Sequence, residues 1–342
     1  MKFRYPEYYR KFRCTADKCS DSCCIGWEID IDSDTQAYYR SVGGTFGSRL
    51  RDNISDGSFV LTPEERCPFL NSMNLCDIYT ELGEDKLCQI CSDHPRYYEW
   101  FGSVKEGGAG LCCEAAAELI LTEEHILAED DVPDEDCEDY DTELFELLLK
   151  ARSEITDTLQ NESFPEAVER VLSYAEELQY NIDNGEYVLP EGTVLIAAEK
   201  ADIRGILGYY AGLEPINEKW IPYIRRCAEL SDGSGGVDEE FLPYVRRIAV
   251  YFIFRYFLKG VFDGEILSRV KLAVLSSWVT AYLWKTEKSE KGKCPHEKRV
   301  SIAKDYSKEI EYCEENLAAL SDAFYDNGLF STPKLIWLYS GS

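Results

Sequence analysis

Ten cysteine residues crowd the first third of the chain, and their thiols are the side chains best suited to chemistry. The chain has 342 residues and 14 Cys, of which only Cys137, Cys227, Cys294 and Cys313 follow residue 113. Thiolates bind zinc or iron–sulfur clusters in reducing compartments and form disulfides mainly in oxidising ones. The N-terminal segment from Met1 to Pro6 lacks the apolar stretch of a secretory leader. We therefore expect a cytoplasmic protein whose thiols bind metal.

The spacing of these cysteines is typical of metal-binding loops. Residues 14–24 have the pattern Cys-x4-Cys-x3-Cys-Cys, and Cys88-x2-Cys91 is a metal-knuckle pair. The candidate ligands are Cys14, Cys19, Cys23, Cys24, Cys67, Cys76, Cys88, Cys91, Cys112 and Cys113. One tetrahedral zinc uses four ligands, so ten thiols favour an iron–sulfur cluster, or two sites, with zinc as the alternative. Some thiols are then structural, as one of the adjacent Cys23 and Cys24 is expected to be.

Other side chains near these motifs are candidates with two interpretations each. His94 follows Cys91 by three residues and either completes a mixed ligand set or forms part of a turn. Arg96 either anchors an anionic group or makes a surface salt bridge. Acidic and apolar residues alternate from Trp27 to Asp32, which predicts a short strand whose acids receive a lysine or form a solvated edge. The pair Cys294 and His296 is interpreted as incidental.

The net charge limits the classes of partner. A net charge of -28 repels nucleic-acid phosphates and attracts cationic groups such as lysine side chains. The most apolar stretch, Ile248 to Phe254, is far shorter than a membrane span. We therefore expect no nucleic-acid partner and no membrane partner.

The composition along the chain predicts a mainly α protein, with an irregular cysteine-rich module packed on a C-terminal helical bundle. Residues 129–143 are almost wholly acidic and predict a solvated linker between a metal-binding module at 1–128 and a helical domain at 144–342. Apolar residues recur at helical spacing in six segments, which are 144–159, 163–178, 194–211, 239–261, 265–284 and 300–324. Ser163 and Glu166 predict a capping box at the start of the second segment.

The cysteine motifs resemble those of a known family. Cys14-x4-Cys19-x3-Cys23-Cys24, CPFL at 67–70, CDIY at 76–79 and CQICSDHPR at 88–96 are similar to the CxxCxxCC family of zinc- or iron-chelating proteins. The whole chain more closely resembles the flagellin lysine-N-methylase (FliB) branch, including residues 306–317 and the apolar stretch 241–273. The resemblance implies methylation of flagellin lysines with S-adenosylmethionine, and a 4Fe–4S cluster in the cysteine module.

The sequence departs from two common signatures of enzymes that use S-adenosylmethionine. It has no strand followed by a G-x-G turn, and Cys19-x3-Cys23-Cys24 fails the last spacing of the radical-enzyme motif. Methylation requires an uncharged lysine amine, so carboxylates and tyrosine hydroxyls that orient and deprotonate it are the groups to seek. Glu311 and Tyr306 are our catalytic candidates, whereas Cys313 shares an apolar stripe and is predicted to be core.

Two other functions agree with the same residues. The surplus of thiols and the acidic charge suit a protein that carries or senses metal or redox state without catalysis. The cysteines equally suit zinc that acts as a scaffold for a helical interaction module.

Overall fold

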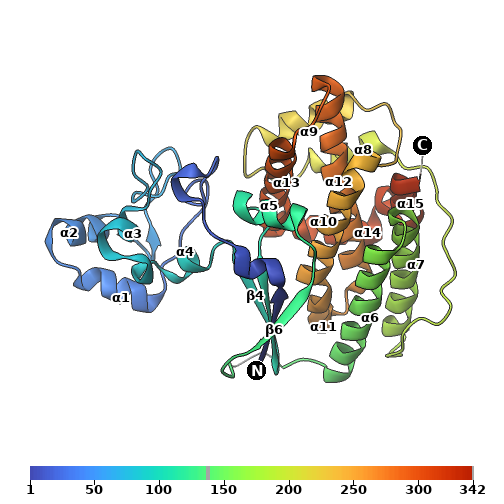
Figure 1. Cartoon of the computed structure of the whole chain (residues 1–342), viewed down its shortest axis with the longest axis horizontal. Coiled ribbons are helices and arrows are strands. Elements are labelled where there is room, and N and C mark those ends of the chain that lie inside the picture. The colour runs from blue at the N-terminus through green and yellow to red at the C-terminus, as the bar shows by residue number, and fades with distance from the viewer. Residues whose placement is uncertain (136–138, 341–342) are drawn as a thin grey trace.

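The computed structural model describes residues 1–135 and 139–340, and it has two bodies (Figure 1). Residues 14–94, here called the cysteine module, form the smaller body, drawn in blue and cyan to one side. Residues 1–12, 96–135 and 139–340 form the main body, in which a small sheet lies against many helices. Each body has its own cluster of buried apolar side chains. The mainly α fold is confirmed, and the metal-binding character of the cysteine-rich region stays a prediction.

The sheet of the main body draws its strands from both sides of the cysteine module. Its strands are β1 (Lys2–Pro6), β4 (Arg96–Phe101), β5 (Val104–Ala109) and β6 (Leu127–Asp131), in the order β4-β5-β1-β6. β1 pairs with β5 in parallel and with β6 antiparallel. Residues 129–131 of the predicted acidic linker are thus part of the edge strand β6. Lys2 and Arg4 of the neighbouring strand β1 pair with the carboxylates of Asp131 and Glu129. Residues 136–138 of that linker lie outside the described residues.

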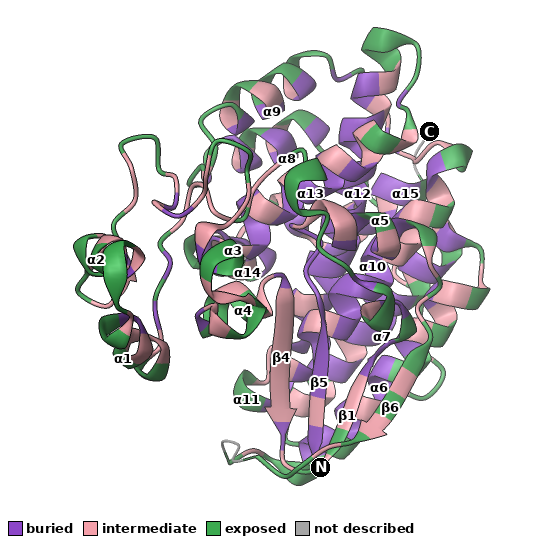
Figure 2. Ribbon diagram, turned by 60° about the vertical axis from the view of Figure 1, so that its left-hand side comes forward, coloured by how far each residue is buried: buried purple, intermediate pink, exposed green. Residues whose placement is uncertain are grey.

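One face of the sheet packs on helices and the other is open, as Figure 2 shows. Aromatic rings cover the open face, where Phe3 lies 6.1 Å from Tyr98 and Tyr98 lies 6.2 Å from Trp100, centroid to centroid. Gly107 of β5 lies between the rings of Phe3 and Tyr98. A Cβ at this position would come within 2.7 Å of Phe3 and 2.9 Å of Tyr98. The absence of a side chain at Gly107 thus lets rings from two flanking strands close over the central one.

We expect Gly107→Ala to lower the free energy of unfolding by about 1–3 kcal/mol, because the added methyl group forces the two rings apart. Gly208→Ala is the matched control. Its Cβ would meet nothing within 4 Å in a helix, so alanine should leave stability unchanged or raise it by up to about 1 kcal/mol. Urea unfolding of both variants measures the difference, and equal stability of the two would contradict the packing argument.

The cysteine module is built from short elements around a small core. Its elements are η2 (Ala16–Lys18), α1 (Ser33–Ser41), α2 (Gly44–Asp52), β2 (Ile54–Ser55), β3 (Ser58–Phe59), α3 (Asp77–Leu82), η3 (Glu84–Lys86) and α4 (Gln89–Asp93). The core contains Ile29, Ile31, Tyr39, Leu50, Phe59, Cys67, Phe69, Ile78 and Cys88. Two of the predicted ligands therefore lie inside the apolar centre of this body.

Helices form the rest of the main body. They are η1 (Glu7–Lys11), α5 (Glu114–Thr122), α6 (Thr142–Asn161), α7 (Phe164–Asp183), α8 (Ile203–Tyr210), α9 (Trp220–Glu229), η4 (Glu239–Phe241), α10 (Leu242–Tyr256), η5 (Phe257–Lys259), α11 (Gly260–Asp263), α12 (Ile266–Lys291), α13 (His296–Glu311), α14 (Glu314–Asp326), η6 (Gly328–Phe330) and α15 (Thr332–Ser340). α12 is central and contacts α7, α10, α13, α14 and α15. Among the described residues, α12 is also the one helix long and apolar enough to span a membrane, and 94% of its apolar window is buried inside the protein.

Several predicted elements differ in the structure. Residues 194–202 are not helical, so the third predicted helix is reduced to α8, which begins after Asp202 caps the amide of Gly205. The last predicted helix breaks at Tyr312 and Cys313 into α13 and α14. Trp27 to Asp32 forms only an isolated bridge at Asp30, because the short loop has no long partner strand. α7 starts as predicted, but Ser163 bonds the Glu166 side chain and caps no backbone amide.

Candidate functional site: thiols and the seam between the two bodies

Five of the ten candidate thiols gather at the core of the cysteine module. Cys67 and Cys88 are buried in it, and Cys24, Cys76 and Cys91 pack against it. A hydrogen bond with Cys88, together with burial and the nearby thiol of Cys24, raises the pKa of Cys91. Burial raises the pKa of Cys67 to about 11, and the neighbouring thiols of Cys76 and Cys88 add to the effect. Residues far apart in the sequence thus bring five sulfur atoms into one neighbourhood.

A second group of thiols lies where the module meets α5. Burial raises the pKa of Cys113 to about 11, with a further contribution from the thiols of Cys19 and Cys23. The Cys19 thiol donates to Oε2 of Glu114 at 3.8 Å. Burial raises the pKa of the adjacent Cys112 to about 12.

The positions of the remaining candidate thiols limit which metal sites can form. Cys14 is exposed, and its sulfur accepts a bond from the Ala16 amide at 3.4 Å. Cys313 is buried, which agrees with its predicted place in the core, and His296 pairs with Glu118 rather than with Cys294. Across the described residues, no three His, Cys, Asp or Glu side chains stand in position to hold a single metal ion.

An aromatic cluster connects the cysteine module to the end of α13. The rings of Trp27 and His94, from the module, lie 5.4 Å and 6.0 Å from the ring of Tyr312, and 5.6 Å from each other. All three side chains are partly exposed. Burial lowers the pKa of His94 to about 4, and the positive charges of Lys308 and Arg255 contribute, so the imidazole is neutral near pH 7.

Charged groups also hold the module on α13. The carboxylate of Asp21 pairs with Lys304 at 2.7 Å and with Lys308 at 2.6 Å. Although burial acts to raise it, these two ammonium groups lower the pKa of Asp21 to about 2. Arg96, expected to bind an anion or a carboxylate, instead stacks on Phe12 at 5.1 Å and donates to the Ser92 carbonyl. The contact surface between the bodies, which we call the seam, is therefore polar and aromatic.

Behind the seam lies a buried carboxylate centred on Glu311. The Arg255 guanidinium contacts Oε2 of Glu311 at 2.8 Å, and the two side chains are 11% and 0% exposed. The hydroxyls of Tyr251 and Tyr256 donate to the same oxygen at 2.9 Å and 3.0 Å, and Ser307 donates to the other oxygen at 2.5 Å. Both carboxylate oxygens are thus hydrogen-bonded, as a buried charge requires.

Tyr306 belongs to a different polar network. Its hydroxyl donates to Ser276 at 2.9 Å and lies 3.0 Å from the hydroxyl of Tyr210. The structure therefore brings Glu311, but not Tyr306, into direct contact with the residues behind the seam. A catalytic role for either residue stays a prediction.

Sequence reasoning missed most partners of Glu311. Arg255, Tyr251 and Tyr256 come from α10, about 55 residues or more upstream of Glu311. One signal was present, because a single arginine within the apolar segment from Ile248 to Phe257 must find a buried partner. The identity of that partner depended on the tertiary contacts between side chains near the C-terminal ends of α10 and α13.

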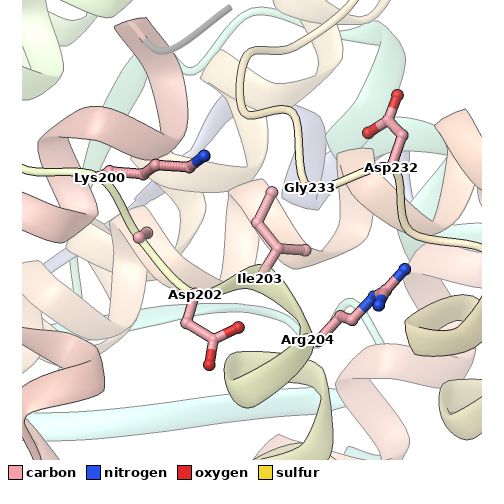
Figure 3. Close-up of a pocket in the computed structure, with 7 residues that line it drawn as sticks. Lys200, Asp202, Ile203, Arg204, Asp232 and Gly233 are labelled. Carbon is pink, nitrogen blue, oxygen red and sulfur yellow. The ribbon is translucent and has the colours of Figure 1, made fainter.

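A separate surface pocket of about 550 Å³ lies between the start of α8 and the loop at 231–236 (Figure 3). Asp202 caps the Gly205 amide, Arg204 donates to the Ser231 carbonyl at 2.8 Å, and Asp232 accepts from Ser234. These groups are already used in local contacts, so we assign no ligand to the pocket.

Comparison with known proteins identifies the family. The model of the FliB lysine N-methylase C-terminal domain matches residues 135–338. The flagellar biosynthetic protein FliU of Salmonella muenchen is 29% identical over 133 residues, which cover 36% of this chain and 79% of that protein. The lysine-N-methylases of Salmonella typhimurium and Salmonella choleraesuis are each 26% identical over 133 residues, or 36% of this chain and 33% of theirs.

The comparison leaves part of the relatives and part of this chain unmatched. The alignment spans a third of the length of those two lysine-N-methylases. No solved structure matches the chain. The likeness of the cysteine motifs to the CxxCxxCC family stays a prediction. Since the domain model covers more than half of the sequence, the chain belongs to the FliB lysine N-methylase family.

Proposed function

We propose that this chain is a protein-lysine N-methyltransferase that acts on flagellin or another lysine-bearing protein and uses S-adenosylmethionine in the cytoplasm. The observation that carries the proposal is the match of residues 135–338 to the FliB lysine N-methylase domain. Two relatives are named lysine-N-methylase, and a third is named for flagellar biosynthesis. The matched region supplies the buried Glu311 and its tyrosines. The net charge of -28 favours approach of a lysine-rich surface.

We also propose that the cysteine module binds a 4Fe–4S cluster through four of its five core thiols. The donor set supports this, because these neighbouring residues are all thiols and each would be stabilised as a thiolate by iron. A cluster spreads its ligands around several iron atoms, so it does not need the close arrangement of a single-ion site. When bound, it would fix loops that have little regular structure of their own. The candidate ligands are Cys24, Cys67, Cys76, Cys88 and Cys91.

The residues behind the seam have a positioning role in this proposal. Glu311 and Arg255 neutralise each other, and the guanidinium lies 5.5 Å from the ring centroid of Tyr312. The buried pair thereby fixes the ring of Tyr312 at the surface where the two bodies meet. Glu311 itself is fully buried and accepts from four donors, so in this arrangement it orients other groups.

The test incubates the purified, metal-loaded chain with flagellin and S-adenosylmethionine labelled in the methyl group. We expect label on flagellin lysines, located by peptide mass spectrometry. Flagellin whose lysine amines have been chemically dimethylated beforehand is the control and should take up little label. A folded, metal-loaded chain that transfers no label to untreated flagellin would contradict the proposed activity.

A non-catalytic metal or redox sensor is the second candidate, and the second thiol group at Cys19, Cys23 and Cys113 favours it. Anaerobic purification separates the metal alternatives. A brown protein with an absorption band at about 400 nm supports iron–sulfur ligation, whereas a colourless protein that contains zinc supports the scaffold function. Methyl transfer to flagellin would exclude a sensor without catalysis.

A further inference from the structure

We propose that the substrate's lysine side chain binds in the seam between the two bodies, against Trp27 and Tyr312, with His94 as the hydrogen-bond acceptor for its amine. This inference rests on the proposed methyltransferase function and assigns a place for its substrate. The three rings come from two loops of the cysteine module and from the end of α13. The site is therefore complete only when both bodies are in place.

Trp27 and Tyr312 supply the kind of surface that binds an alkylammonium group. Their ring centroids are 5.4 Å apart with planes inclined by 50°, and His94 lies against both. Aromatic faces attract cations, and methylated amines bind to such faces because they are weakly hydrated. The three side chains are partly exposed, so a lysine on another protein can reach them from solvent.

The chain already places one lysine at this surface. The Lys308 ammonium lies 5.1 Å from the centroid of the Trp27 ring, while the Asp21 carboxylate pairs with it at 2.6 Å. This contact shows that the indole accepts a lysine ammonium on one face.

His94 is available to contact an amine. Among the residues that the structure describes, the partly exposed imidazole packs against the rings of Trp27 and Tyr312 and makes no hydrogen bond through its ring nitrogens. A neutral imidazole has one nitrogen that accepts a hydrogen bond. An amine N–H that donates to this nitrogen would have its lone pair held in a fixed direction.

The surrounding charges favour an uncharged amine. The groups that face His94 are Lys308 from α13 and Arg255 from α10, with Asp21 and Lys304 beside Lys308. Burial, with a smaller contribution from these two cations, disfavours an additional positive charge at His94, although Lys308 pairs with Asp21 and Arg255 pairs with Glu311. An incoming lysine ammonium would therefore lose its proton to water more readily here than in free solution.

Methyl transfer at this site balances with S-adenosylmethionine as the methyl donor. The lysine ammonium releases a proton to water and becomes an amine that donates one N–H to His94. The nitrogen lone pair forms a bond to the methyl carbon as that carbon's bond to the sulfonium sulfur breaks, and the sulfur keeps the bonding electrons. The product is a methylated ammonium, which the faces of Trp27 and Tyr312 still accommodate.

A binding measurement tests the site without relying on turnover. The probe is a short peptide with trimethyllysine, compared with the same peptide carrying an uncharged isostere, and binding to the metal-loaded chain is followed by calorimetry. We expect Trp27→Ala to weaken binding of the cationic peptide about tenfold. Trp100→Ala is the matched control, because Trp100 also lies near a cation, Lys105 at 4.6 Å, but on the open face of the sheet. Equal binding by wild type and Trp27→Ala, or equal binding of the two peptides, overturns the proposal.

Turnover of two His94 variants tests the acceptor. His94→Phe keeps a ring but removes the acceptor, and we expect kcat to fall about 100-fold, whereas His94→Gln keeps an acceptor and should remain within about tenfold. Equal rates for both variants overturn the role of His94. Loss of iron from His94→Phe overturns it as well, because His94 would then be a metal ligand. The two proposals can fail separately. If the wild-type chain binds the cationic peptide through Trp27 but transfers no methyl group, the methyltransferase function is contradicted while the binding site remains supported.

Discussion

Arg255→Ala should lower the free energy of unfolding by about 3–5 kcal/mol, one of the largest effects that we expect in the main body. The substitution leaves the carboxylate of Glu311 buried and without a countercharge, with only hydroxyl donors from tyrosine and serine. Removing one partner of a buried pair costs far more than removing both, because the remaining charge keeps its desolvation penalty. Chemical denaturation followed by circular dichroism measures the change.

Two further variants show whether the buried charge is the cause. Lys11→Ala breaks an exposed pair with Glu123 and should cost less than about 0.5 kcal/mol. The double variant Arg255→Met with Glu311→Met removes both charges and should recover much of the stability lost in Arg255→Ala. If Arg255→Ala is no less stable than Lys11→Ala, the buried pair does not have the energetic role assigned to it.

Cys88→Ser should release most of the iron and loosen the core of the cysteine module. Cys88 is 1% exposed, bonds to Cys91 and lies within the module's apolar cluster, so a lost ligand there affects both the metal and the packing. We expect the iron content per chain to fall at least tenfold. Mutation of groups that only hydrogen-bond to metal ligands typically lowers metal affinity about 10–100-fold, and loss of a ligand itself should lower it further. Iron analysis and amide hydrogen exchange over residues 29–78 measure the two effects.

Cys227→Ser is the matched control for this experiment. Cys227 is also fully buried, but it lies in α9 within the core of the main body. Its replacement should leave the iron content unchanged, whatever it costs in stability. If Cys88→Ser keeps the same iron as Cys227→Ser, Cys88 is not a ligand.

The helical elements were predictable wherever local periodicity matched burial. Leu144, Leu148, Ala151 and Ile155 recur at helical spacing and indeed face the core along α6. The apolar character of residues 272–284 on nearly every side predicted a buried central helix, and α12 is that helix. Predictions failed at 194–202, where the chain forms an irregular loop that exposes Val194 and Leu195, because periodicity alone does not distinguish an exposed loop from a helix.

The sheet and the seam could not be predicted from local patterns. β1 lies about 100 residues before its parallel partner β5, and the cysteine module occupies most of the interval. Similarly, Asp21 meets Lys304 and Lys308 across more than 280 residues. Such pairs depend on how whole bodies dock, which no window of neighbouring residues records.

The spacing of cysteines and the periodicity of apolar residues were sufficient to indicate a thiol-rich module and a helical bundle, because ligand loops and amphipathic helices are local properties of a chain. Only the tertiary structure decided which thiols are neighbours and which groups surround Glu311 and His94. The physical reason is that burial and charge pairing are sums over contacts between distant segments. The pKa and the binding partners of a thiol, a carboxylate or an imidazole depend on those contacts. The sequence shows only that the group is present.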